Sequence, residues 1–174
     1  VLNNISVDAC MSDYSMGEIS IFKQNHLAHV NKNDLIIFDR GYPSYDMFAT
    51  IMHKYNANFL VRVKRKVYKE ISFLFDKDSD IKDTVITLKP STKKLAKELI
   101  NDNLPLEIKI RFVQVILDDG EVEVLATSVL NSNSITTNEF KELYFKRWGI
   151  ETYYEILKNR LSLENFTGQS ALSI

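Results

Sequence analysis

The sequence predicts an α/β fold whose core is divided by a strand-rich segment. Residues 35–38 (LIIF) form an unbroken apolar run, which is typical of a strand buried on both faces of a sheet. A helical pattern over 44–56 and a second apolar strand over 58–63 follow, and this order favours parallel strands joined by a right-handed crossover. Strands of alternating polarity then dominate between 64 and 130.

Length and composition fit a globular protein. The chain has 174 residues, enough for one core and a small second lobe, with 45% hydrophobic and 26% charged residues. The formal net charge of −1 points to no partner, so a nucleic-acid surface would have to come from local clusters of charge. The single cysteine, Cys10, excludes an internal disulfide and favours a cytoplasmic setting. No apolar run approaches the roughly 18 residues of a membrane span, so we expect no membrane partner.

The first part of the chain alternates strands and helices. Residues 5–9 read as a short strand after an Asn-Asn turn, and a helix is expected over 17–29. Ser44 is a candidate N-cap for the helix over 44–56. The apolar stripe of that helix comprises Met47, Phe48, Ile51 and Met52.

The middle of the chain is rich in predicted strands. We expect them within 65–75, 83–90 and 106–130, and Asp119-Gly120 is a strong signal for a hairpin turn inside the last range. These strands would form a β-rich insertion between two parts of the α/β core.

Two further helices complete the predicted order. A short one is expected over 93–102, and a long one begins at Thr136 or Thr137 and runs to about Arg160. The chain thus divides into a first core part, the insertion and a core completion with the long helix, over 1–63, 64–135 and 136–174.

Asp39 stands just past the carboxyl end of the predicted buried strand, before a glycine turn. In open α/β sheets, ligands bind in the crevice beyond the strand ends, so this carboxylate is a candidate functional group. An aspartate before Arg-Gly also commonly caps a turn, and position alone leaves both interpretations open.

The long helix carries a second stripe beside its apolar one. On a wheel of about 100° per residue, the apolar positions gather on one side. We expect these positions to form the buried stripe of the helix, and they are Leu143, Ile150, Tyr154, Leu157 and Leu161. Tyr144, Arg147, Glu151 and Lys158 flank that side rather than the solvent-facing back. Spacing alone favours ordinary ion pairs four residues apart on a helix surface.

The chemistry of these residue types favours a site. Two carboxylates brought together by folding suit Mg²⁺ or Mn²⁺, and a metal pair can activate water for phosphodiester cleavage. Arg147 can bind a phosphate with two hydrogen bonds, Lys158 supplies a point charge, and Tyr144 can pack on a sugar or bond a phosphate.

Cations also gather at the end of the strand over 58–63. They are Arg62, Lys64, Arg65, Lys66 and Lys69. We interpret them as contacts to a DNA backbone, because they begin at a core strand and Tyr68 lies among them. A second group, Lys93, Lys94 and Lys97, reads equally well as solvated lysines.

The residues described so far make a family resemblance visible. The chain resembles the DDE transposases of bacterial insertion sequences, in the branch marked by a Tyr-x2-Arg-x3-Glu-x6-Lys signature. Tyr144, Arg147, Glu151 and Lys158 match that spacing without a gap. DLIIFDRGYPS resembles the segment with the family's second catalytic aspartate, here Asp39, and LENFTGQS resembles the stretch after the signature.

The resemblance implies a ribonuclease-H-like core with a β-rich insertion. It implies Mg²⁺- or Mn²⁺-dependent cleavage at transposon ends, a hairpin intermediate and strand transfer into target DNA. Asp39 and Glu151 would be catalytic metal ligands in a two-ion site, and Tyr144, Arg147 and Lys158 would hold the terminal phosphate. It further implies a homodimer on DNA, in the bacterial cytoplasm at the nucleoid.

One family feature is not evident in the sequence. The family requires a third carboxylate, an aspartate on the first core strand, and Asp8 and Asp13 are the only early candidates. We expect a piece truncated at both ends, with that strand and its aspartate before Val1, and therefore poor activity of this piece alone. Two alternatives stay open: a stand-alone ribonuclease-H-like nuclease, and a non-catalytic transposase remnant that only binds DNA.

Overall fold

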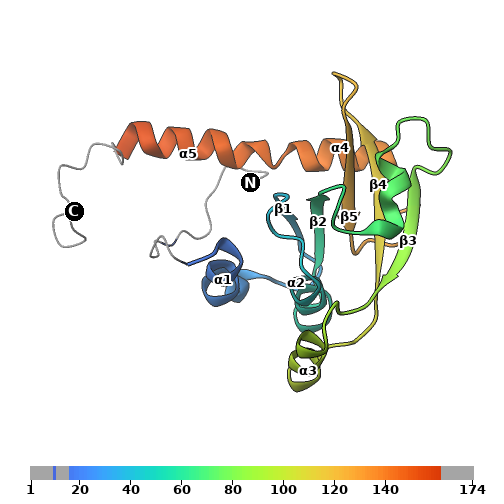
Figure 1. The fold of residues 1–174 in the computed structure, drawn as a ribbon. Coiled ribbons are helices and arrows are strands. Elements are labelled where there is room, and N and C mark those ends of the chain that lie inside the picture. The colour runs from blue at the N-terminus through green and yellow to red at the C-terminus, as the bar shows by residue number, and fades with distance from the viewer. Residues whose placement is uncertain (1–9, 11–15, 162–174) are drawn as a thin grey trace.

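The computed structural model describes residue 10 and residues 16–161. It is a mixed α/β structure with a five-stranded sheet (Figure 1). The strands are β1 (Leu35–Phe38), β2 (Asn58–Val63), β3 (Asp83–Leu88), β4 (Ile108–Ile116) and β5 (Val122–Thr127). The α-helices are α1 (Glu18–Ile21), α2 (Tyr45–Ala49), α3 (Lys93–Asn101), α4 (Thr137–Phe145) and α5 (Trp148–Leu161). Tighter or wider helical turns are η1 (Phe22–His26), η2 (Leu27–His29), η3 (Thr50–Lys54) and η4 (Lys69–Phe75). The predicted strand at residues 5–9 lies outside the described residues.

The strand order in the sheet is β1-β2-β5-β4-β3. The first two strands are parallel, with Phe38 opposite Val61, and this confirms the predicted parallel pair. All other pairings are antiparallel. The predicted hairpin joins β4 to β5, and Gly120 adopts a φ of 87° in its turn, a conformation that glycine reaches without steric cost.

The helices of the first part follow the predicted ranges. α1, η1 and η2 together cover 18–29, and α2 with η3 covers 45–54. Ser44 occupies the N-cap position of α2, but its side chain makes no capping hydrogen bond. In the predicted stripe, Met47, Phe48 and Ile51 are fully buried, because this side of α2 packs on the sheet.

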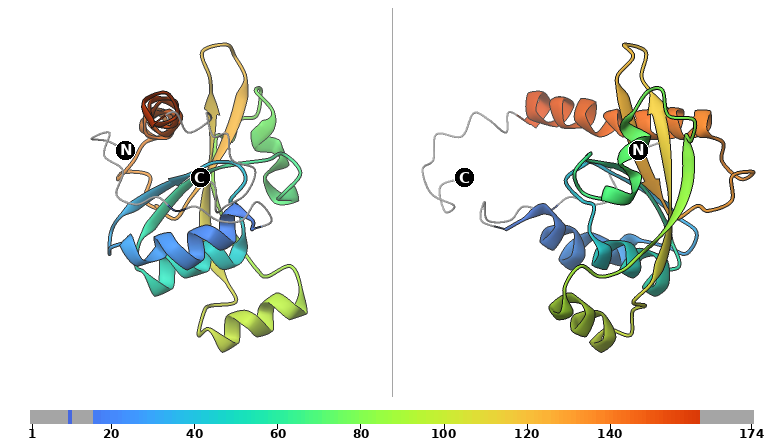
Figure 2. Two further views of the ribbon diagram at one scale, coloured as in Figure 1. Left: turned by 90° about the vertical axis from the view of Figure 1, so that its left-hand side faces the viewer. Right: turned by 45° about the vertical axis from the view of Figure 1, so that its right-hand side comes forward.

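The sheet has an apolar core on each face. On one face, Phe59 and Val61 of β2 pack with α2. On the other, Leu60 packs with Leu125 of β5 and with Phe140 of α4. Figure 2 shows α4 and α5 on the opposite side of the sheet from α1 and α2. Because successive residues of a strand point to opposite faces, every second residue of β1, β2 and β5 faces α4.

The structure corrects the prediction of a strand at 65–75. This segment forms a turn followed by η4. Ile71 and Leu74, three residues apart, are both fully buried, and this spacing places them on one side of a helical turn. The period of the apolar residues in this segment is therefore helical and not that of a strand.

The strands of the middle segment do not form a sheet of their own. β5 pairs with β2 through Leu60 and Thr127, so that β3, β4 and β5 extend the sheet begun by β1 and β2. The division of the chain at 63 and 135 stays a prediction.

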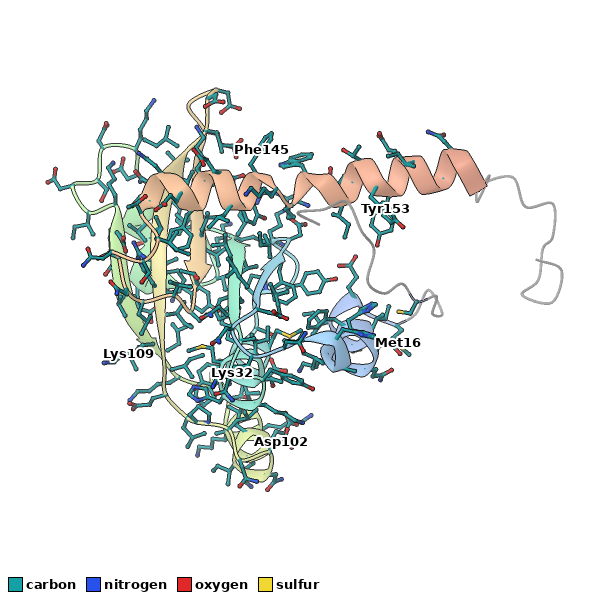
Figure 3. All side chains as sticks on the ribbon, turned by 180° about the vertical axis from the view of Figure 1, so that it is seen from behind. Met16, Lys32, Asp102, Lys109, Phe145 and Tyr153 are labelled. Carbon is teal, nitrogen blue, oxygen red and sulfur yellow. The ribbon has the colours of Figure 1, made fainter. Side chains whose placement is uncertain are left out.

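The long helix is interrupted, and two residues of its predicted apolar stripe are exposed. α4 ends at Phe145 and α5 begins at Trp148. α5 extends beyond the sheet (Figure 1), and Figure 3 shows Tyr153 on this projecting part from behind. Ile150 and Tyr154 are accordingly 38% and 57% exposed, which corrects the prediction that they are buried. Among the described residues, no helix is long and apolar enough to cross a membrane.

Candidate active site

Asp39 and Arg62 lie side by side at the carboxyl ends of β1 and β2. Phe38 is opposite Val61 in the parallel register, so the next residue of each strand continues the pair. Ile37 and Leu60 belong to the core under α4, and Asp39 and Arg62, two positions further on, face the same side. The backbone of Asp39 is held in a turn by the N–H of Tyr42, which donates to its carbonyl at 3.1 Å. Its side chain remains 45% exposed.

Arg147 connects Asp39 to Glu151. Its Nε lies 3.8 Å from Oδ1 of Asp39, and its Nη1 donates to Oε1 of Glu151 at 2.9 Å. The two carboxylates come from distant parts of the chain and share one guanidinium. The carboxylate of Glu151 is about half exposed, whereas the Arg147 side chain is largely buried.

Tyr144 is buried beneath this group. Its side chain belongs to the core with Leu60 and Phe140, and its hydroxyl has no hydrogen-bond partner. Burial raises the pKa of Tyr144 to about 12, against a smaller opposing effect of the Arg147 guanidinium. The guanidinium carbon of Arg147 lies 5.7 Å from the Tyr144 ring and 5.0 Å from the Trp148 ring. Tyr144 is thus a core residue, and not a boundary residue as the helix wheel predicted.

The helix that carries Tyr144 is fixed at its start by a capping box. The hydroxyl of Thr136 accepts a hydrogen bond from the backbone N–H of Glu139, whose side chain accepts one from the backbone N–H of Thr136. This arrangement satisfies N–H groups that the first helical turn leaves free. It confirms the predicted start of the helix.

Arg62 forms an ion pair with Glu123 of β5. Burial opposes the charge on Arg62, but the hydrogen bond and charge of Glu123, with smaller effects of Tyr144 and Asp39, raise its pKa. The Nε atom of Arg62 is buried without a hydrogen-bond partner. Glu123 was not among the predicted site residues. The sequence could have indicated it, because Glu123 is a charged residue at a position where the alternation of the predicted strand places the side chain on a buried face.

The remaining predicted DNA-binding residues are exposed. Lys64, Arg65 and Lys66 lie in the turn after β2, at the same end of the sheet as Asp39. Arg65 donates to the carbonyl of Phe75 at 2.8 Å, so its side chain is tied to η4. Lys158 lies exposed on α5, about two turns beyond Glu151.

Tyr42 is a second residue that the sequence reasoning did not single out. Its ring stacks on Phe38 at 5.2 Å, and its hydroxyl is hydrogen-bonded to Glu18 of α1. Burial, with the neighbouring Glu18 carboxylate, raises the pKa of Tyr42 to about 12. Tyr42 therefore links the turn that contains Asp39 to α1.

A cavity of about 970 Å³ opens beside the group. Arg62, Glu123, Tyr144, Arg147 and Trp148 are among its lining residues. Asp39 and Glu151 are not in the lining, so the cavity adjoins the carboxylates through the two arginines. The lining also contains four carboxylates, those of Asp118, Asp119, Glu123 and Glu142, so the cavity as a whole is of mixed charge and its cations and aromatic rings gather at Arg62, Tyr144, Arg147 and Trp148.

The donor set is compatible with a hard divalent cation. Asp39 and Glu151 offer carboxylate oxygens, and Mg²⁺ is commonly held by one or two carboxylates together with substrate phosphates. Within the described ranges, no cluster of three or more His, Cys, Asp or Glu side chains is placed to hold a metal ion. Arg147 contacts both carboxylates, and a cation bound to both would replace that contact.

The mixed sheet has Asp39 just past β1, and α4, its connection and α5 bring Tyr144, Arg147 and Glu151 towards that end of the sheet, which is the arrangement of a ribonuclease-H-like fold. The chain belongs to the transposase DDE domain family, whose sequence profile matches residues 5–171. This confirms the expected family. Bacterial origin, the signature branch and truncation stay predictions.

A solved structure is similar in part. It is the piggyBac transposase synaptic complex with hairpin DNA, with a TM-score of 0.47 and 12% sequence identity. The match covers 79% of this chain and 27% of that one, so this chain spans about a quarter of its length. No curated protein sequence matches the chain.

Proposed function

We propose that this chain is the catalytic domain of a DNA transposase, which cleaves phosphodiester bonds at transposon ends and transfers the freed strand to target DNA. The observation that carries the proposal is the meeting of Asp39 and Glu151 at one guanidinium, in a family of transposase domains. In this proposal both residues hold Mg²⁺ or Mn²⁺. Two such ions would activate the attacking oxygen and stabilise the leaving one.

The DNA contacts follow from the arrangement of the cations. Tyr144 and Arg147 both line the cavity, and each has one buried polar atom without a hydrogen-bond partner. In this proposal a terminal phosphate reaches both side chains after a small local rearrangement and accepts hydrogen bonds from them. Lys158 adds charge further along α5, and Arg62 lines the same cavity. Lys64, Arg65 and Lys66 extend the basic surface for the adjoining backbone. By analogy with the family, we propose that a homodimer holds the paired ends, in the bacterial cytoplasm.

Cleavage of a labelled duplex tests the proposal. The duplex carries the terminal sequence of the element that encodes the chain, and Mn²⁺ is the added metal. We expect slow, metal-dependent nicking, because two carboxylates hold a metal more weakly than a fuller ligand set. Glu151→Gln, which keeps the shape of the side chain and removes its charge, should abolish it.

The same assay separates the alternatives. Nicking without joining to a second duplex would indicate a stand-alone nuclease. Binding of the duplex with no cleavage at any Mn²⁺ concentration would indicate a DNA-binding remnant. Equal nicking by wild type and Glu151→Gln would refute the proposed site.

A further inference from the structure

We infer that Glu123 is a positioning residue that keeps Arg62 away from Asp39, so that the Asp39 carboxylate stays open to a divalent cation. The inference rests on the proposed function, because it concerns the metal ligand assigned there. It gives a role to a buried carboxylate that is not itself a predicted ligand.

The three side chains form a row across one face of the sheet. Asp39 follows β1, Arg62 belongs to β2 and Glu123 belongs to β5, and all face the side covered by α4. Arg62 pairs in register with Leu125, two residues from Glu123 on the same face. The cation therefore lies between two carboxylates on neighbouring strands, and its ion pair is formed with Glu123.

The burial of Glu123 explains why its ion pair with Arg62 matters. Glu123 is only 8% exposed, and a buried charge without its partner is costly. If Glu123 lost its charge, Arg62 would need another anion, and Asp39, which follows the neighbouring strand β1 next to the pair of Phe38 and Val61, lies on the same side of the sheet. The Nε atom of Arg62 already lacks a hydrogen-bond acceptor. A direct pair between Arg62 and Asp39 would then occupy the carboxylate oxygens that a metal needs.

Arg147 shows the same arrangement on the other side of Asp39. It hydrogen-bonds to Glu151 at 2.9 Å and stays 3.8 Å from Asp39. Each of the two arginines beside Asp39 is thus held more closely by a different carboxylate. Asp39 keeps a half-exposed side chain in spite of two cationic neighbours.

Binding of Mn²⁺ to the whole chain without DNA tests the inference. The loss of the free Mn²⁺ signal in electron paramagnetic resonance measures it without any catalytic activity. Wild type should bind, Asp39→Ala should not, and Glu123→Gln should bind about tenfold more weakly, as for other residues that support a metal ligand. Glu107→Gln is the matched control, because Glu107 also pairs with a cation, Lys89 at 2.7 Å, at an exposed position. It should match wild type.

A second background shows whether Glu123 acts through Arg62. In Arg62→Met, adding Glu123→Gln should change Mn²⁺ affinity less than twofold. An equal tenfold loss in both backgrounds would mean that Glu123 attracts the metal by charge alone, and would overturn the inference. If Glu123→Gln alone does not fold, the double variant, which removes both charges, carries the test: it must bind Mn²⁺ as tightly as wild type.

The outcomes also separate this inference from the proposed function. Asp39-dependent binding that Glu123→Gln leaves unchanged refutes the role of Glu123 only. Binding that is absent from wild type, or equal in wild type and Asp39→Ala, refutes the metal site and with it this inference.

Discussion

At the scale of single residues, Tyr144 shows a conflict between stability and binding. Its ring is packed in the core, yet its hydroxyl is buried without a hydrogen-bond partner. Such a hydroxyl loses its bonds to water on folding and gains nothing in return. In the proposed function, the phosphate of a DNA end supplies the missing acceptor.

Tyr144→Phe should therefore change stability and DNA binding in opposite directions. We expect the free energy of unfolding in urea to rise by about 1 kcal/mol, because the unsatisfied hydroxyl is removed. Binding of a fluorescent duplex should weaken. The control is Tyr45→Phe, because the Tyr45 hydroxyl donates to the Pro105 carbonyl at 3.0 Å. That change should cost about 1 kcal/mol of stability and leave DNA binding unaltered.

The raised pKa of Tyr144 also predicts a loss of stability in alkali. The phenol ionises at about 10.0 in the unfolded chain and at about 12 in the folded one. Between these values the unfolded state has lost more protons, so the free energy of unfolding falls as pH rises. Urea unfolding at a series of pH values from 10 to 12 should show this decline. It should be shallower in Tyr144→Phe, and an identical decline would contradict the assignment.

At the scale of elements, Arg111 joins α4 to the sheet. This residue of β4 is 1% exposed, and its Nε donates to Asp83 of β3 at 2.9 Å. Its Nη1 donates to the carbonyl of Ile135, just before α4, at 3.0 Å. Its guanidinium carbon lies 5.0 Å from the Phe140 ring of α4. One side chain thus connects two strands, a connecting segment and the helix that carries Tyr144.

Arg111→Met should destabilise the fold strongly. Asp83 keeps its charge when Arg111 is removed, but its side chain is 29% exposed and water partly solvates it, so we expect a cost of about 1.5–3 kcal/mol, the range for hydrogen bonds to charged groups. Urea unfolding measures the loss. The matched control is Lys89→Met, which breaks the exposed pair with Glu107 and should give no measurable change. Similar unfolding curves for the two variants would show that Arg111 is not an anchor.

Elements also show what could be predicted from the sequence. The apolar run at 35–38, the parallel strand at 58–63 and the Asp119-Gly120 turn carry local signals, and the structure contains all three. The prediction of a strand at 65–75 was wrong. Its short apolar pattern fits the period of a strand and that of a helix, and only the burial of both Ile71 and Leu74 in the folded protein distinguishes them. The exposure of α5 was missed, because a helix wheel shows which side is apolar but not whether anything covers it.

The candidate site was predictable only in part. Asp39, Tyr144, Arg147 and Glu151 stand in a recognisable pattern, and their roles stay predictions. Glu123 was missed, because alternation along β5 assigns it a face, but only the pairing of β5 with β2 brings it to Arg62. Pairing between distant strands is a property of the folded sheet and has no local signal.

At the scale of the whole molecule, two groups of exposed lysines lie at opposite ends of the sheet. Lys64 and Lys66 lie at the end of the sheet near Asp39, whereas α3 with Lys93 and Lys97 lies at the other end (Figure 1). The formal net charge of −1 is a sum over the whole chain and does not show where the cations are placed. Of these two groups, the first lies at the end of the sheet where the proposed function places the DNA.

The salt dependence of DNA binding should show which of the two groups of lysines contacts the DNA. The affinity for a fluorescent duplex, measured over a range of salt concentrations, should fall linearly on logarithmic axes. The double variant Lys64→Gln/Lys66→Gln should reduce the slope by about 1–2, since each phosphate contact contributes roughly one unit. Lys93→Gln/Lys97→Gln removes the same charge and should leave the slope unchanged. The reverse result would place the DNA on the α3 side.

The interruption between α4 and α5 has a mechanical consequence. Around it, the N–H groups of Arg147, Gly149 and Ile150 donate to the carbonyls three residues earlier, at 3.0, 3.1 and 3.0 Å. A short tightened stretch inside a long helix is a typical hinge. α4 is anchored in the core by Tyr144, whereas α5, which carries Glu151, extends beyond the sheet. Bending there would move the Glu151 carboxylate while the Tyr144 ring stays in the core, so that in the proposed function the metal ligand and the phosphate contact would move independently.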